Sequence, residues 1–183
     1  MEDTCVNVHI VITGLEAGQT WLFEEVGQQG QKRLVATYRA KLTRLDGTLF
    51  WFTVTRDSAR VVFGQEVERF AVGTECPPSK PSYPYHAKYQ QAPRNGDCLL
   101  LYEGRDETGY YLYGQGKARR NSILIHATPA SSLGCFGIGG GALAYRLWWR
   151  ELLQATYNFA PSYNMYVHVE PRPASHHERH LAY

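Results

Sequence analysis

The chain has 183 residues, 44% hydrophobic and 20% charged, a composition typical of one globular domain and not of a disordered chain. The formal net charge of +2 is too small to indicate a nucleic-acid-binding surface, and no run of about 18 apolar residues predicts a membrane span. The aromatic content of 13%, with 13 tyrosines, favours strands or an aromatic-lined groove.

The N-terminal stretch MEDTCVNVHIVITGL has acidic residues where a secretory signal needs positive charge. We therefore expect a chain made without a Sec-type signal, or one whose leader has been removed. The four cysteines are scattered and form no CxxC pair, which argues against a zinc knuckle. No metal or other cofactor is expected, and the sequence does not decide whether disulfides form.

Apolar alternation predicts a first strand over residues 6–15, and strand-like patterns follow at 20–26, 33–45, 48–57 and 59–73. Asp46-Gly47 predicts a hairpin between the strands at 33–45 and 48–57. Residues 74–97 carry five prolines and no usable periodicity, so we interpret them as a long ordered surface loop. Its tyrosines either line a peptide groove or hold the loop down; they are Tyr83, Tyr85 and Tyr89.

Residues 98–116 predict a hairpin that turns near 106–109, and SILIH, residues 122–126, predicts a buried strand. ALAYRLWWRELLQATY, residues 142–157, is the one convincing helix, and 164–170 predict a last strand. The tail at 171–183 is expected to be flexible, and its three histidines fit a loose polar terminus better than a metal site. The fold class is therefore β-rich α+β in a single domain over 1–183.

The stretch ILIHATPASSLGCFGIGGG places a histidine at a strand end and a cysteine nine residues later, among glycines. An imidazole can activate a thiol and shuttle its proton, and glycines permit a sharp turn that exposes a thiol. His126 and Cys135 are therefore the candidate base and nucleophile. The competing interpretations are a buried thiol beside a core histidine, and a different pair, Cys98 with His86.

These residues, ILIH followed by SSLGCFGI, resemble the signature of the L,D-transpeptidase-like family, in which a strand ends in His and Ser/Thr-x-Gly-Cys follows. The short gap is similar to compact variants found in secreted antibacterial effectors. The resemblance implies an L,D-transpeptidase-like β-sandwich or barrel with one main helix after the catalytic cysteine. It also implies that Cys135 forms a thioester with a peptide carbonyl while His126 acts as general base.

By the same resemblance, Ser132, with Ser131 beside it, helps to orient the histidine, and the amides of Gly134 and Cys135 line an oxyanion site. The long-gap members carry a second His where this chain has Leu133, and an Arg where it has Gly137. A substrate carboxylate must therefore be held elsewhere. The candidates for this role are Arg119 and Arg120, although the two arginines would equally fit a solvated strand edge. Tyr83 and Tyr85 are candidate walls of the substrate groove.

The expected function is that of a cysteine enzyme acting on peptidoglycan stem peptides. If water resolves the thioester, the enzyme is an L,D-carboxypeptidase. If an amine resolves it, the enzyme is an L,D-transpeptidase or exchanges a terminal D-amino acid. The resemblance also implies that the protein is a toxin, exported by a specialised route to the periplasm or cell wall. It implies a dedicated immunity protein as partner. The alternatives are a non-enzymatic cell-wall-binding or virion-associated β-module and, less favoured, an unrelated papain-like hydrolase, because papain-like enzymes place Cys before His.

Overall fold

The computed structural model describes residues 6–23, 32–56, 83–93, 96–113, 119–120, 123–128, 135–160 and 163–172, without the side chains of 21–23, 32–34 and 119–120. Eight strands close a barrel. In their order around it they are β1 (Val6–Phe23), β11 (Tyr163–Val169), β4 (Tyr85–Ala92), β5 (Gly96–Tyr102), β9 (Ile123–Ala127), β10 (Phe136–Ile138), β3 (Leu49–Thr55) and β2 (Lys32–Thr43).

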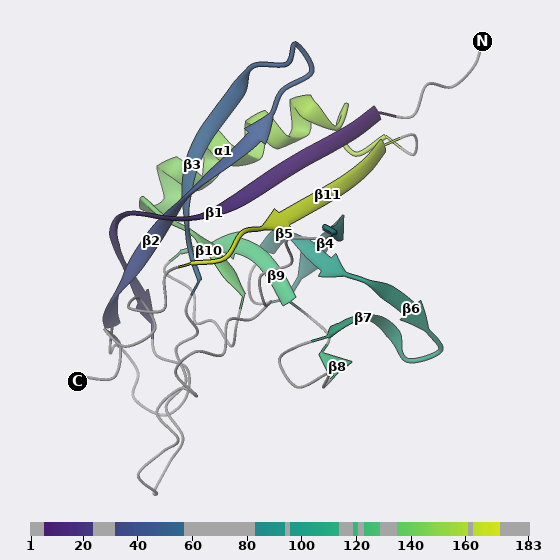
Figure 1. The fold of residues 1–183 in the computed structure, drawn as a ribbon, viewed down its shortest axis with the longest axis horizontal. Helices are drawn as coiled ribbons and strands as arrows, with labels where there is room; N and C mark the ends of the chain where they lie inside the picture. Colours follow the sequence, from purple (N-terminus) through teal and green to yellow (C-terminus); the bar gives the residue numbers. More distant parts are fainter. Residues whose placement is uncertain are drawn as a thin grey trace, which may run out of the picture.

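A second, three-stranded sheet consists of β6 (Gly104–Asp106), β7 (Gly109–Tyr113) and β8 (Arg119–Arg120). Figure 1 shows it projecting from the barrel on the side away from β2 and β3. In the described part of the chain, α1 (Gly141–Ala155) is the one helix, and it packs against β3, β9 and β10. The β-rich α+β class expected from the sequence is confirmed at this level.

The core lies inside the barrel and is built by alternate residues of the eight barrel strands. On β9, for example, Ile123 and Ile125 belong to the core, while Leu124 belongs to a second, smaller apolar cluster. Because successive side chains of a strand point to opposite faces, this alternation separates an inner face from an outer face of the barrel wall. Trp148 and Leu152 of α1 join the inner cluster.

Several predicted elements are confirmed. The Asp46-Gly47 hairpin joins β2 and β3, and Gly47 adopts a φ of 81° that favours glycine. β6 and β7 form the predicted hairpin around 106–109, and the strands at 122–126 and 164–170 are β9 and β11. The predicted helix at 142–157 is α1, shorter by two residues at its C-terminal end.

Other expectations were wrong. Residues 6–15 and 20–23 form one long strand, β1, whose pairing with β2 shifts register on either side of Glu16. The predicted loop at 74–97 contains β4, and β10 was not foreseen. Residues 24–26 and 59–73 lie outside the described residues.

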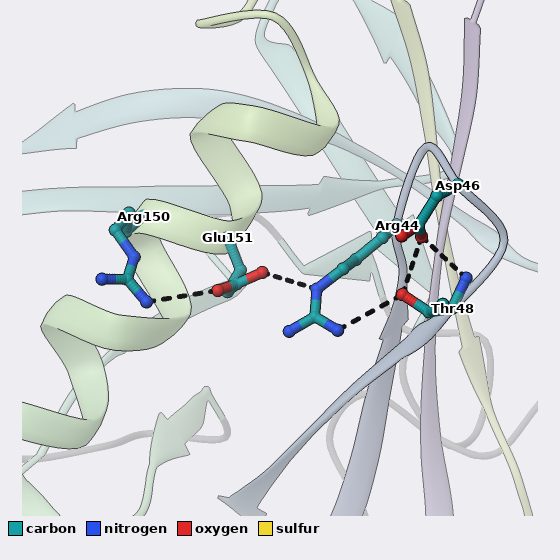
Figure 2. A network of polar contacts seen from close by, with 5 residues as sticks. All are labelled: Arg44, Asp46, Thr48, Arg150 and Glu151. Atoms are coloured by element: carbon teal, nitrogen blue, oxygen red, sulfur yellow. Dashed lines mark hydrogen bonds and ion pairs between the residues drawn. The ribbon is translucent and has the colours of Figure 1, made fainter.

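A polar network ties α1 to the turn between β2 and β3 (Figure 2). Arg44 Nε donates to Glu151 Oε2 at 2.7 Å, and Arg44 Nη1 donates to Thr48 Oγ1 at 3.3 Å. Asp46 Oδ1 accepts the N–H of Thr48 at 2.9 Å, and Arg150 Nη2 donates to the other oxygen of Glu151 at 3.4 Å. The hydrogen bond from Arg44 lowers the pKa of Glu151, so this largely buried carboxylate stays charged.

The described chain remains packed to Arg172, two residues into the segment expected to be a flexible tail. Glu170 N donates to Ile12 O at 2.9 Å, and Arg172 Nη1 donates to Tyr38 Oη at 3.2 Å, with its guanidinium 5.5 Å from the centre of that ring. Residues 173–183, with the three tail histidines, lie outside the described residues. No described helix has both the length and the apolar composition needed to cross a membrane.

Candidate active site

His126 is fully buried at the end of β9, and its ring is held by a neighbouring backbone carbonyl. Nδ1 lies 2.7 Å from the oxygen of Ala127. Because a carbonyl oxygen can only accept, Nδ1 carries the ring proton and Nε2 presents its lone pair. Nε2 is buried with no hydrogen-bond partner in the described structure. Burial lowers the pKa of His126, so the imidazole is neutral near neutral pH.

Cys135 directly precedes β10, and its side chain is 8% exposed. The sequence predicted a thiol exposed on a glycine turn, and this was wrong. Of the glycines that follow, Gly137 lies within β10, between β9 and β3, and the other three come after β10 and lead into α1. The backbone N–H of Leu124 donates to Cys135 Sγ at 3.3 Å. A donor at this position would stabilise negative charge on the sulfur.

Strand register puts the two candidate groups on one face. β10 pairs in parallel with β9, with Phe136 opposite Ile125 and Gly137 opposite His126. Continued by one residue, this register places Cys135 opposite Leu124, whose backbone N–H donates to the sulfur of Cys135. Since Ile125 and Phe136 point into the core, Cys135 and His126 share the outer face as diagonal neighbours. Such neighbours are separated by about 7–8 Å between Cα atoms, which an imidazole ring can span.

Three buried threonines lie on the segments next to β10, two on β3 and β2 and one directly after β9. The N–H of Gly137, beside His126, donates to the Thr55 hydroxyl of β3 at 2.9 Å, and Thr55 pairs with Thr37 of β2. The hydroxyl of Thr128 donates to the carbonyl of Ile138. All three threonines are buried. This polar layer and the Ala127 carbonyl were not predictable from the sequence, because no local motif marks either.

Cys98, the competing thiol, lies on β5. The pairing of β5 with β9 sets Leu99 opposite Ile125, and continuing it by one residue places Cys98 opposite His126. Cys98 is fully buried and donates to the carbonyl of Gln90 at 3.1 Å. Burial, and then the nearby Cys135, raises the pKa of Cys98 to about 11, so it stays a protonated thiol near neutral pH. His86 lies four residues from Gln90 along β4, too far to activate Cys98.

The remaining predicted residues fall elsewhere. Tyr85 is fully buried in the barrel core, so its expected role as a groove wall was wrong. Tyr83 is 55% exposed, and its hydroxyl donates to Glu103 at 3.4 Å. Arg119 and Arg120 pair with β7 in the small sheet. Three predicted residues lie outside the described residues: Ser131, Ser132 and Gly134.

Comparisons with family models, with curated proteins and with solved structures gave no match to this chain. Among the described residues, no three histidine, cysteine, aspartate or glutamate side chains gather closely enough to hold a metal ion. The site is therefore interpreted from its own geometry.

Alkylation should distinguish the two thiols. At pH 7.5 we expect iodoacetamide to modify Cys135 much faster than Cys98, because the thiolate is the reacting form and the raised pKa of Cys98 suppresses it. Peptide mapping by mass spectrometry resolves the two sites. A His126→Gln variant should lose the fast reaction at Cys135. Equal and slow labelling of both thiols in the folded protein would contradict an activated Cys135.

Proposed function

We propose that this chain is a cysteine enzyme of the L,D-transpeptidase-like type, with the corresponding fold, and that it acts on peptidoglycan stem peptides. The observation that carries the proposal is the arrangement of His126. Its Nδ1–H is held on a carbonyl, its Nε2 is buried and has no hydrogen-bond partner among the described residues, and it shares one sheet face with Cys135. A neutral imidazole held in this way is suited to accept a proton from a neighbouring thiol.

In the proposed reaction, the Cys135 thiol gives its proton to Nε2 of His126, and the sulfur attacks the carbonyl carbon of a stem-peptide bond. The C–N bond then breaks, the departing amine takes the proton from His126, and a thioester remains on Cys135. Water resolves the thioester to a free carboxylate, whereas an amine resolves it to a new peptide bond. In both cases His126 accepts the proton of the incoming group, and the thiol is restored.

The resemblance to compact effectors supports a wider proposal. The protein would act in the periplasm or cell wall of a rival bacterium after specialised export, and a dedicated immunity protein would block the site. Either acceptor chemistry removes or rearranges the terminal residues of the stem peptides on which crosslinking depends.

A second candidate is a non-enzymatic wall-binding module. It is favoured by one observation, the low exposure of both groups: His126 is 0% and Cys135 8% exposed. Buried cysteines are common as small apolar side chains. In this interpretation the barrel face binds the wall, and the His/Cys pair only fills space.

One experiment separates the two functions. Purified protein is incubated with disaccharide tetrapeptide and pentapeptide, with and without added D-Met, and the products are followed by mass spectrometry. We expect loss of a terminal D-Ala or its exchange for D-Met, abolished by Cys135→Ala and retained by Cys98→Ala, the matched control in the adjacent strand. Unchanged fragments together with binding to intact sacculi would instead support the wall-binding module.

A further inference from the structure

β10 directly follows Cys135, so the contacts that hold this short strand also set the position of the candidate nucleophile. Toward its far end, β10 pairs with β3 at Ile138 opposite Val54, and the N–H of Gly139 donates to the carbonyl of Thr53 at 2.8 Å. These contacts lie three and four residues beyond Cys135. They fix the end of β10 that leads into α1 and leave the end next to the thiol to other contacts.

Closer to Cys135, the contact between β10 and β3 is made by a buried hydroxyl. The N–H of Gly137, two residues after Cys135, donates to Thr55 Oγ1 at 2.9 Å, and Thr55 is fully buried. The hydroxyl of Thr128 bonds one residue farther along β10, at the carbonyl of Ile138. A buried N–H that loses its acceptor is costly. The bond to Thr55 therefore opposes any movement of this part of β10 away from β3.

The same glycine lies beside the candidate base. Gly137 pairs with His126 of β9, in the parallel pairing that places the thiol and the imidazole on one face. The imidazole is held separately, by the hydrogen bond of its Nδ1 to the Ala127 carbonyl at 2.7 Å. A shift of β10 would thus move the sulfur of Cys135 while the ring stays in place. A misplacement of about 1 Å between reacting groups can cost about 10²-fold in rate.

We infer that Thr55 is a positioning residue, whose hydroxyl holds β10 where the thiol of Cys135 can pass its proton to His126. The inference rests on the proposed function. Thr55 acts through the backbone of Gly137 and takes no part in the transfer of the proton or of the acyl group. Its removal should therefore change the reactivity of the thiol and the rate of turnover, and not the identity of the products.

Thr55→Val tests this role, because valine nearly keeps the shape of threonine and removes the acceptor of the Gly137 N–H. At pH 7.5 we expect iodoacetamide to modify Cys135 about tenfold more slowly, with the half-maximal rate about one pH unit higher, because a displaced imidazole favours the thiolate less. Peptide mapping separates this signal from that of Cys98 on the same face. For disaccharide tetrapeptide, kcat should fall about tenfold with KM little changed.

Thr55→Ser keeps the hydroxyl and should restore both the alkylation rate and kcat. Thr55→Ala also removes the acceptor, without added bulk, and should show the same losses as Thr55→Val. It takes the place of the valine variant if that variant does not fold, as circular dichroism establishes.

The matched control is Thr13→Val. Thr13 is a buried threonine of β1 whose hydroxyl accepts the N–H of Leu15 at 3.2 Å and donates to the carbonyl of Arg39 at 2.7 Å. In the order around the barrel, β2 and β3 separate β1 from β10. We expect this variant to lower the thermal midpoint, as Thr55→Val does, and to leave the alkylation of Cys135 and its pH profile unchanged.

Two results would overturn the inference: wild-type alkylation of Cys135 with an unshifted pH profile in a folded Thr55→Val or Thr55→Ala variant, or an equal loss in Thr13→Val. Failure of the proposed function is distinguishable from both. Fast alkylation that depends on Thr55, without any turnover, would retain the positioning role and remove the enzyme. Turnover that survives the loss of the Thr55 hydroxyl would retain the enzyme and remove the positioning role. Slow alkylation of Cys135 in the wild-type protein would overturn both.

Discussion

Replacing His126 with glutamine should lower kcat/KM for disaccharide tetrapeptide by about 10²–10⁴-fold, the usual contribution of a positioned general base. Glutamine has a similar reach and can still donate to the Ala127 carbonyl, but it cannot accept a proton from the thiol. The measurement is turnover by mass spectrometry at pH 7.5. Circular dichroism and a thermal melt of the same variant establish that it folds.

The matched control is His86→Gln. His86 is exposed on β4 and contacts the rings of Tyr102 and Tyr166, outside the candidate site. Its replacement should leave turnover unchanged. A folded His126→Gln variant with wild-type turnover would contradict the assignment of the base.

The dependence of this reaction on pH follows from the same histidine. Burial lowers the pKa of His126 below its usual value of about 6.5, and only the neutral ring can accept the thiol proton. Activity should therefore fall on acidification through a midpoint below about 6.5. Stability follows the same sign, because a histidine whose pKa is lower folded than unfolded stabilises the fold above its unfolded pKa and loses this effect as the pH falls. His126→Gln should remove both dependences.

The parts of the fold that the sequence predicted correctly are those with a local signal. The Asp46-Gly47 hairpin, the apolar run that becomes β9 and the aromatic-rich helix α1 each depend on residues adjacent in the chain. β4 was missed because prolines lie on either side of it at 84 and 93, and few apolar residues mark its inner face. The parallel pairing of β1 with β11, which closes the barrel, joins residues more than 150 positions apart and has no local signal.

The candidate site divides in the same way. His126 and Cys135 could be selected from one short stretch, because a strand end, a histidine and a Gly-Cys sequence follow one another there. Thr55, whose hydroxyl holds Gly137 beside His126, comes from another part of the chain and follows only from the pairing of β3 with β10. The burial of Cys135 was likewise not predictable, because it depends on the neighbouring strands and not on the glycines that follow it.

Replacing Gly14 with alanine should reduce the free energy of unfolding by about 3 kcal/mol, the upper part of the range for overpacking. A Cβ at this position would lie 2.0 Å from the carbonyl oxygen of Pro171 and 3.0 Å from the Cα of Arg172. These are backbone atoms, which cannot rotate away as a side chain can. The segment after β11 would have to move off β1, and the hydrogen bond from Glu170 N to Ile12 O and the packing of Arg172 on Tyr38 would weaken with it.

Guanidinium denaturation followed by fluorescence measures this effect as a lower midpoint with an unchanged slope. Gly104→Ala is the matched control, because its Cβ would also meet atoms at 2.6 and 2.7 Å, but these belong to the far end of the Tyr111 side chain, which can rotate. We expect the control to cost much less. Equal stability of the two variants would show that the contact between Gly14 and the segment after β11 is not needed to hold the barrel closed.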